Sequence, residues 1–223
     1  MFDRLISLIG NENLEKINNV RVCLIGVGGV GGFTLEALVR SGINDITIYD
    51  GDIIDKSNLN RQLITDSTNI GDEKIDVAIK RCKLINPDIN IKGFSYNITP
   101  DNVLELKEYD YVIDACDDIN AKVAIIKYCI NNNIKIVCAL GTGKRLSPMG
   151  VKICTLDKTN NDALARSLRQ RLRKENISLK IPVVYNSDLP INNDKVIASS
   201  IFSPATAGLY LAYYVIEDII KEK

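Results

Sequence analysis

Residues 22–32, with the sequence VCLIGVGGVGG, decide the fold of this 223-residue chain. A short apolar run ends in glycines and an amphipathic run follows over 33–40, which predicts a buried strand, a tight turn and a helix. Gly26, Gly28 and Gly31 form the pattern G-x-G-x-x-G, in which the glycines allow the turn, the approach of a phosphate and close helix–strand packing. The helix start would offer unpaired N–H groups to an anion. The pattern therefore predicts a nucleotide phosphate here, with a turn that binds no ligand as the alternative.

An acidic residue at the end of the next expected strand supports the nucleotide. Asp50 lies 19 residues after Gly31, close to the spacing at which dinucleotide-binding folds place an acid on the ribose hydroxyls. The alternative is that Asp50 only caps the end of a strand. The position of the glycines between strand and helix, together with Asp50, favours nucleotide binding.

Strands and helices alternate along the chain as far as residue 140. This alternation predicts an α/β fold with a Rossmann-like, mostly parallel sheet and helices on both faces. Ligands of such sheets bind beyond the carboxyl ends of the strands. Short helices are expected around Gly10, strands over 22–25, 45–50, 90–94, 109–114 and 135–140, a short helix from 99–101, and longer helices over 71–86 and 121–131.

The pattern changes after residue 145. Further strands are expected over 151–156 and 181–185, and a basic helix over 162–174. Ser203-Pro204 opens a final apolar helix over 205–220, which we expect to be buried or to form part of a dimer interface. We therefore expect a single domain, in which a nucleotide-binding core at 1–145 is followed at 146–223 by a substrate-side and dimer-forming extension.

Composition excludes several chemistries. The chain has no histidine and a formal net charge of zero. Nucleophilic catalysis by Ser-His or Cys-His pairs and His-containing zinc sites are therefore excluded, and no global charge attracts nucleic acid or membrane. The six cysteines form no C-x-x-C pair, so a zinc ribbon is not expected. No signal peptide pattern is present, and we expect a cytoplasmic protein without membrane contact.

Cations and carboxylates follow the predicted strand ends. Arg61 lies in a long polar stretch and Lys74 at a helix start, and two cations suit a triphosphate. Asp114, Asp117 and Asp118 add carboxylates, and Mg²⁺ commonly binds one or two carboxylates together with phosphate oxygens. Each residue alone could be a solvated surface group. Together they favour a nucleoside triphosphate over NAD, because a redox dinucleotide needs neither the metal nor the extra cations.

These pieces together resemble the adenylating superfamily of ubiquitin-activating enzymes and their bacterial ThiF and MoeB relatives. The matching motifs are G-x-G-G-V-G at 26–31, D-x-D at 50–52, S-N-x-x-R-Q at 57–62, G-x-x-K at 71–74 and D-x-x-D at 114–117. The resemblance implies a single adenylating domain that binds ATP and Mg²⁺, and a homodimer.

The resemblance also implies roles for individual residues. Asp50 would bind the ribose, and Asn58, Arg61 and Lys74 the phosphates. Asp117 would bind magnesium, and Arg4 would act in the site of the opposite subunit. The expected catalytic residues are Arg61, Lys74, Asp117 and Arg4. The expected nucleotide-binding residues are Gly26, Gly28, Gly29, Gly31, Asp50, Asp52, Asn58, Arg61, Gln62 and Lys74.

The second half narrows the resemblance to the tRNA threonylcarbamoyladenosine dehydratases. The matching motifs are G-x-G-K-x-x-x-P at 141–148, T-L-D-K-T at 155–159, D-x-L-A-R at 162–166, V-V-Y-N-S-x-x-P at 183–190 and F-x-P-x-x-A-G at 202–208. This resemblance implies a tRNA carrying threonylcarbamoyladenosine as substrate, whose carboxylate is adenylated by ATP and then loses AMP as the modification closes on itself.

Basic residues in the second half suit a tRNA partner. The residues expected to contact tRNA are Lys144, Arg145, Arg166, Arg169, Arg173 and Lys174, most of them on one helix. A solvated helix face is the alternative.

Other functions stay open on the sequence alone. The nearest is an adenylyltransferase that activates the C-terminal Gly-Gly of a small sulfur-carrier protein, although such activators usually carry two C-x-x-C pairs in this half. An NAD-dependent dehydrogenase and a silent nucleotide-binding module are the others. The sequence also leaves open whether a sulfur-transfer protein is a partner and whether Cys116, which lies between acids that raise a thiol pKa, has a role.

Overall fold

The computed structural model describes residues 1–192 and 198–222. Its strands are β1 (Arg21–Ile25), β2 (Asp45–Tyr49), β3 (Asn90–Phe94), β4 (Tyr111–Asp114), β5 (Lys135–Ala139), β6 (Val151–Thr155) and β7 (Pro182–Asn186). Its helices are α1 (Asp3–Ile9), α2 (Asn11–Asn18), α3 (Gly31–Arg40), α4 (Lys74–Ile85), α5 (Ile119–Asn131), α6 (Ala163–Lys174) and α7 (Phe202–Lys221). Short 3₁₀ helices are η1 (Lys56–Asn58), η2 (Val103–Glu108) and η3 (Leu156–Lys158).

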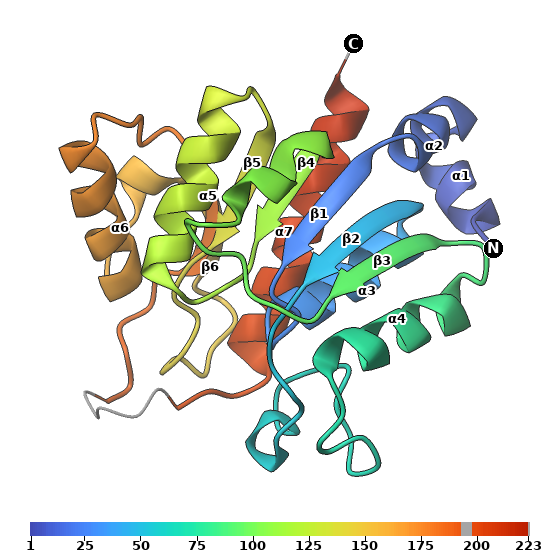
Figure 1. Ribbon diagram of the computed structural model, residues 1–223, viewed down its shortest axis with the longest axis horizontal. Helices are drawn as coiled ribbons and strands as arrows, with labels where there is room; N and C mark the ends of the chain where they lie inside the picture. The colour runs from blue at the N-terminus through green and yellow to red at the C-terminus, as the bar shows by residue number, and fades with distance from the viewer. Residues whose placement is uncertain (193–197, 223) are drawn as a thin grey trace.

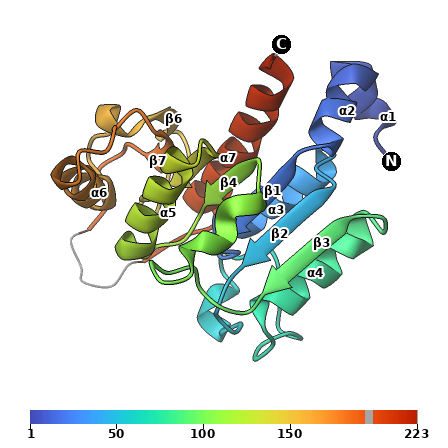
Figure 2. The same ribbon diagram turned by 45° about the horizontal axis from the view of Figure 1, so that its top comes forward.

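The strands form one sheet in the order β3-β2-β1-β4-β5-β7-β6. Every neighbouring pair is parallel except β6 and β7, which are antiparallel. Figures 1 and 2 show the arrows of β1, β2 and β3 running in one direction. The predicted mostly parallel α/β sheet is confirmed, and the chain after residue 145 extends it by two strands.

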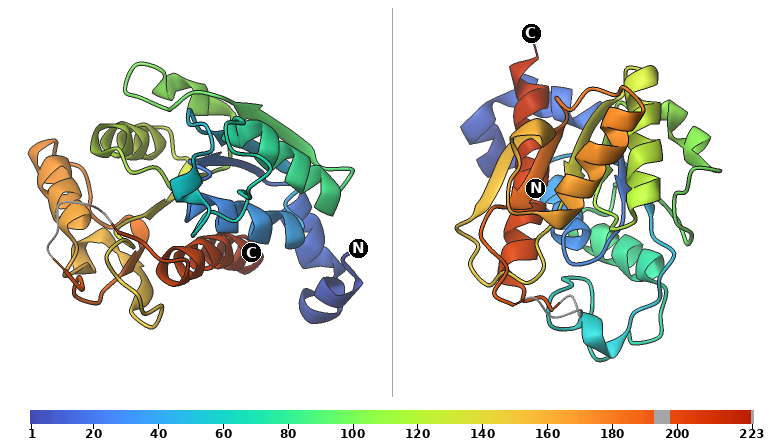
Figure 3. Two further views of the ribbon diagram at one scale, coloured as in Figure 1. Left: turned by 90° about the horizontal axis from the view of Figure 1, so that it is seen from below. Right: turned by 90° about the vertical axis from the view of Figure 1, so that its left-hand side faces the viewer.

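Helices cover both faces of the sheet (Figure 3). Because successive strand residues face opposite sides, β1 contributes Val22 and Leu24 to one buried cluster and Cys23 and Ile25 to the other. The first cluster includes side chains from α3, α4 and α7, and the second includes side chains from α5 and α6. β1 is therefore central and buried on both faces, as its continuous apolar sequence predicts.

The final helix packs closely on α3. A Cβ atom at Gly208 of α7 would lie 2.4 Å from the carbonyl oxygen of Val30, so only glycine fits at this crossing. The hydroxyl of Thr34 donates to the carbonyl of Gly208 at 3.1 Å. One face of α7 is thus buried, while its side chains Leu209, Tyr210 and Tyr213 are exposed. The predicted dimer interface remains a prediction.

The starts of α4 and α7 differ most from the sequence expectation. α4 begins at Lys74 rather than at residue 71, because Gly71 adopts φ +94° in the preceding turn. α7 begins at Phe202, so Ser203-Pro204 lies inside its first turn, where a missing N–H costs little. In the described part of the chain, we find no helix long and apolar enough to cross a membrane.

Candidate active site

A cleft of about 1240 Å³ lies beyond the carboxyl ends of the parallel strands. The two halves of the chain meet here, since the lining includes the glycine turn after β1 and the start of α6. Of the predicted site residues, the cleft is lined by Gly26, Gly28, Gly29, Asp50, Asp52, Asn58, Arg61, Gln62, Lys74, Asp117, Lys144, Arg145 and Arg166.

Backbone crowding fixes the glycine turn. Gly26 has φ +89°, and its N–H donates to the carbonyl of Tyr49 at 2.7 Å. A Cβ at Gly31 would lie 1.8 Å from the carbonyl oxygen of Gly26, an impossible contact. A Cβ at Gly28 would meet nothing nearer than Gln62 Nε2 at 3.7 Å. Gly26 and Gly31 are therefore required by the turn itself, whereas Gly28 leaves its backbone open toward the cleft.

Asp50 joins the end of β2 to the glycine turn. Its Oδ2 accepts a hydrogen bond from the N–H of Val27 at 2.8 Å, and its Oδ1 accepts one from the N–H of Asp52 at 3.0 Å. The carboxylate is buried, with 6% of the residue exposed. Asp50 is thus more than a cap, because it orders two segments of the cleft wall.

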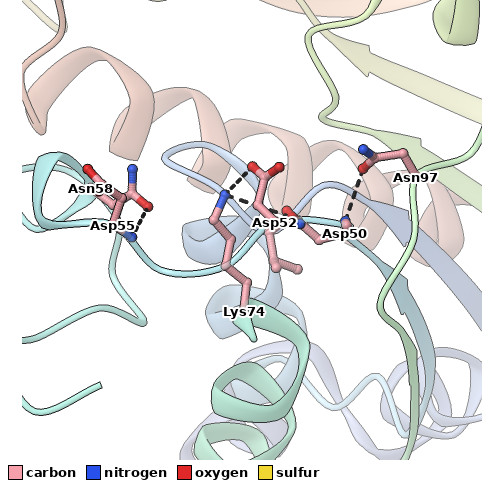
Figure 4. A network of polar contacts seen from close by, with 8 residues as sticks. Asp50, Asp52, Asp55, Asn58, Lys74 and Asn97 are labelled. Atoms are coloured by element: carbon pink, nitrogen blue, oxygen red, sulfur yellow. Dashed lines mark hydrogen bonds and ion pairs between the residues drawn. The ribbon is translucent and has the colours of Figure 1, made fainter. Parts of the chain in front are cut away.

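Lys74 stands at the start of α4 between two carboxylates (Figure 4). Its Nζ lies 2.6 Å from Asp52 Oδ2 and 3.8 Å from Asp50 Oδ1. The lysine side chain is 5% exposed and that of Asp52 is 64% exposed. The ammonium is therefore held in the wall of the cleft by a carboxylate that water can reach.

A compact turn presents the loop after η1 to the cleft. Asp55 and Asn58 form a capping box, in which each side chain accepts from a backbone N–H (Figure 4). Arg61 Nη1 donates to the carbonyl of Ser57 at 2.6 Å and to Asn60 Oδ1 at 3.0 Å. Gln62 is buried, and among the described residues its Oε1 has no hydrogen-bond partner. This loop thus brings a cation and an amide beside the glycine turn.

The three carboxylates after β4 have different surroundings. Asp114 is fully buried and pairs with Lys122 at 3.0 Å, and Asp118 accepts from the N–H of Ala121 at 2.7 Å as the N-cap of α5. Within the described ranges, the Asp117 carboxylate makes no hydrogen bond or ion pair, and it lines the cleft. Asp117 is therefore the carboxylate of this group that remains open to a ligand.

A magnesium ion fits this donor set. The described residues contain no group of three or more His, Cys, Asp or Glu side chains that could hold a metal alone. Mg²⁺ needs no such cage, because it keeps several waters and commonly binds one or two carboxylates together with phosphate oxygens. Asp117 could supply that carboxylate to a metal that arrives with a nucleotide.

Cys116 lies beside Asp117 but is unsuited to nucleophilic attack. Burial raises the pKa of its thiol above the usual range, and the Asp114 carboxylate raises that pKa further. The thiol therefore stays protonated near neutral pH, as the neighbouring acids predict.

Two of the six predicted tRNA contacts are bound to the protein's own backbone. The guanidinium of Arg145 donates to the carbonyls of Gly143, Asp188 and Asn161 at 2.8, 3.0 and 2.6 Å, and the residue is buried. Arg169 donates to the carbonyl of Thr159 at 3.1 Å. These contacts favour a role in shaping the wall of the cleft on the side of α6.

The other basic residues are divided between the cleft and the outer end of α6. Arg166 is exposed and lines the cleft, and Lys144 lines it with a left-handed backbone at φ 61°. Arg173 and Lys174 are exposed and do not line it, and the side chain of neither makes a hydrogen bond or ion pair within the described part of the chain. Binding of tRNA by these residues stays a prediction.

Arg4 is far from the cleft of its own chain. It is exposed on α1. Figure 1 shows α1 near the starts of the strands, whereas the cleft is lined by residues that follow the strand ends. Arg4 and Gly31 do not line the cleft. A role for Arg4 in the site of another subunit remains a prediction that this position allows.

Sequence reasoning missed several residues of the site. Asn97, just after β3, accepts from the N–H of Gly51 at 3.0 Å (Figure 4). Asp162 caps α6 and lines the cleft. Lys122 is fully buried, and although burial lowers its pKa, the Asp114 carboxylate together with Cys116 and Cys138 raises that pKa above the usual value. The sequence could have indicated Asn97, since this residue follows β3, whose carboxyl end lies at the same edge of the sheet as the cleft.

Known proteins resemble this chain in sequence and in fold. The ThiF family model matches residues 2–187. The chain is 33% identical to tRNA threonylcarbamoyladenosine dehydratase of Bacillus subtilis, over 99% of this chain and 95% of that protein. It is 39% identical to the Haemophilus influenzae protein of the same name, over 74% of this chain and 64% of that protein.

A solved structure agrees over nearly the whole chain. The Escherichia coli tRNA N6-threonylcarbamoyladenosine dehydratase in complex with ATP superposes with a TM-score of 0.93 at 31% sequence identity. The match covers 98% of this chain and 93% of the E. coli chain.

Proposed function

The chain belongs to the ThiF family, and from that premise we propose that it is an ATP-dependent tRNA threonylcarbamoyladenosine dehydratase. Its substrate is a tRNA that carries threonylcarbamoyladenosine in the anticodon loop. The observation that carries the proposal is the meeting of the glycine turn, Arg61, Lys74 and Asp117 in one cleft. The Bacillus subtilis and Escherichia coli proteins described above match nearly the whole chain, and both are named dehydratases of this kind.

The reaction has two steps. An oxygen of the threonyl carboxylate attacks the α-phosphorus of ATP, and pyrophosphate leaves to give an acyl-adenylate. A nucleophilic atom of the same modification then loses its proton and forms a bond to the acyl carbon. The bond between that carbon and the AMP oxygen breaks, and a ring results. One oxygen of the carboxylate departs with AMP, so the nucleoside loses the elements of water. No protein nucleophile is required, which agrees with the absence of histidine.

Charge control is the main task of the protein in this reaction. A carboxylate must approach a polyanion, and preorganised donors lower the cost of bringing the two together. In our proposal Lys74 and Arg61 face the phosphates, Gly28 and Gly29 present backbone N–H groups, and Asp50 faces the ribose. Asn58 and Gln62 add amide contacts from the same loop.

Magnesium is the proposed second cofactor. When bound, it supplies positive charge that screens the phosphate oxygens and the departing pyrophosphate. Asp117 is the residue that would hold it, and Asp52 also lines the cleft as the partner of Lys74.

A homodimer is part of the proposal. Arg4 cannot serve its own cleft from α1, and it would complete the donor set of a second subunit. The exposed apolar side chains of α7 suit a face that a second copy covers. We infer the core at 1–145 as the nucleotide side and 146–223 as the tRNA and dimer side. A sulfur-transfer partner remains an expectation without further support.

Pyrophosphate release tests the proposal. Purified protein with ATP and Mg²⁺ receives bulk tRNA that carries threonylcarbamoyladenosine or, in parallel, unmodified tRNA. Release that requires the modification supports the dehydratase. Release only with a carrier protein ending in Gly-Gly would instead support the adenylyltransferase alternative, which the absence of C-x-x-C pairs disfavours.

A further inference from the structure

We propose that Lys122 is a positioning residue for metal binding, because its buried ion pair with Asp114 holds the loop that carries Asp117. This inference rests on the proposed function, in which Asp117 binds magnesium. Neither Lys122 nor Asp114 touches the nucleotide in this proposal. Their effect is on the place and direction of the Asp117 carboxylate.

The buried ion pair links the two ends of the loop that carries Asp117. Asp114 is the last residue of β4 and Lys122 lies in the first turn of α5, so the pair joins the two ends of the loop 115–118. Both side chains are 0% exposed, and Lys122 Nζ lies 3.0 Å from Asp114 Oδ2. The link therefore crosses the loop inside the core, where water does not screen it.

Other contacts fix every neighbour of Asp117. The N–H of Cys116 donates to Asp114 Oδ1 at 3.1 Å, and the N–H of Ala115 donates to the carbonyl of Ile25 at 2.8 Å. On the other side, Asp118 caps α5 and its carbonyl accepts from the N–H of Lys122 at 3.0 Å. Within the described residues, Asp117 is thus an unpaired carboxylate on a loop whose one flank is bonded to the Asp114 carboxylate and whose other flank is bonded to the backbone N–H of Lys122.

A contribution to folding stability does not by itself explain why this buried ion pair is present. Burying two opposite charges costs desolvation energy, and apolar replacements of a whole buried pair are often neutral or stabilising. The pair meets at 3.0 Å without hydrogen-bond geometry, so what it provides, and apolar side chains cannot, is an electrostatic attraction between a strand end and a helix start. Mg²⁺ is strict about ligand geometry, so a link that fixes a single protein carboxylate has a direct effect on metal affinity.

Three variants separate positioning from stability. Lys122→Met leaves the buried Asp114 carboxylate without its partner. The double variant Asp114→Asn, Lys122→Met removes both charges and keeps the oxygen that accepts from Cys116. Lys127→Met is the matched control, because Lys127 lies on the same helix and pairs with Glu175 at 2.7 Å on the exposed surface.

Two readouts are needed. Melting temperature reports stability. Free Mn²⁺, measured by electron paramagnetic resonance with protein and α,β-methylene ATP, reports metal affinity without turnover. We expect Lys122→Met to lower the melting temperature by roughly 10 °C, and the double variant to recover most of that loss. In both, metal affinity should fall about tenfold, as for other groups that orient a ligand, while Lys127→Met changes neither readout.

A double variant that regains both melting temperature and metal affinity would overturn the inference, because the pair would then act on stability alone. Asp117→Ala distinguishes that result from a failure of the proposed function. If Asp117→Ala binds Mn²⁺ as the natural chain does, the metal assignment itself is wrong. If Asp117→Ala loses the metal while the double variant keeps it, only the positioning role of Lys122 is wrong.

Discussion

The ammonium of Lys74 lies 2.6 Å from the carboxylate of Asp52, although Lys74 is the residue at which we expect phosphates to bind. The two side chains differ in exposure, since the lysine is buried and the aspartate is largely exposed. Asp52 can therefore move into water while Lys74 remains in the wall. The Asp52 carboxylate therefore neutralises the Lys74 ammonium until phosphate oxygens take its place.

Lys74→Met should lower the rate of pyrophosphate release about a hundredfold, because one preorganised donor to the phosphates is lost. Asp52→Asn is the control, since it removes the partner of Lys74 but leaves the ammonium in place. We expect that variant to keep most of the rate and to bind ATP at least as well. Steady-state kinetics with varied ATP measure both. An equal loss in the two variants would mean that the ion pair, rather than the cation, is what the reaction needs.

Asp117→Ala and Asp118→Ala should have opposite effects. The Asp117 side chain makes no hydrogen bond or ion pair within the described residues, so its loss should abolish turnover and leave the melting temperature unchanged. Asp118 caps α5, and its loss should cost about 1 kcal/mol of stability while turnover persists. Thermal melts and pyrophosphate assays on the same preparations check the pair. Full turnover in Asp117→Ala would contradict the magnesium assignment.

The glycine turn gives a matched pair of alanine substitutions. Gly31→Ala places a Cβ 1.8 Å from the carbonyl oxygen of Gly26, and it should destabilise the fold by at least about 3 kcal/mol. Gly28→Ala meets only Gln62 Nε2 at 3.7 Å and should fold normally. We nevertheless expect it to weaken ATP binding, because the new methyl group stands where the backbone faces the phosphates. Denaturant unfolding and calorimetric ATP titration measure the two effects.

Basic residues that look alike in sequence should behave differently toward tRNA. Charge reversal of Arg173 and Lys174 should weaken tRNA binding and lower the salt slope by about one unit per lost phosphate contact. Arg145→Gln should lower the melting temperature and leave the salt slope of tRNA binding unchanged, because the Arg145 guanidinium donates hydrogen bonds to three backbone carbonyls of the protein itself. Filter binding at several salt concentrations gives the slopes. An unchanged slope in the reversed variant would make that end of α6 a solvated surface.

Cys116 should be dispensable despite its place beside Asp117. Burial and the Asp114 carboxylate raise its thiol pKa, so the reactive thiolate is scarce at neutral pH and becomes more abundant only as pH rises well above that. We expect slow modification by iodoacetamide at pH 7.5 and unchanged turnover in Cys116→Ala. Mass spectrometry of the alkylated protein and the pyrophosphate assay test this. Rapid alkylation at neutral pH would show that the thiol is more accessible than its surroundings indicate.

Periodicity predicted the sheet because its strands are short runs of apolar or alternating residues bounded by turn residues. The run 22–25 is buried on both faces, and this is why its apolar residues do not alternate with polar ones. Periodicity predicted the helix starts less accurately. Helix α4, for example, begins after the backbone leaves the turn at Gly71 and not where the polar residues end. The direction of β6, antiparallel to β7, is set by how the two strands pair across residues 156–181, and no local pattern predicts that pairing.

The sequence predicted which residues lie at the cleft better than it predicted what each of them does there. Asp114, Asp117 and Asp118 are neighbours in sequence and chemically alike, yet one is buried with Lys122, one is open and one caps a helix. Arg145 and Arg166 are both basic residues of the same half, yet one is buried on carbonyls and the other is exposed. Burial and partners, which set these roles, depend on segments distant in sequence.

The sequence by itself determined the strand-turn-helix at 22–40, the alternation that makes the sheet parallel, and the set of residues beyond the strand ends. These features follow from local steric limits on glycine and from the period of apolar side chains. The tertiary structure alone decided which cations and carboxylates are partnered and which are open to a ligand. That choice is made by contacts such as Lys122 with Asp114, which only the packing of α5 against β4 brings within 3.0 Å.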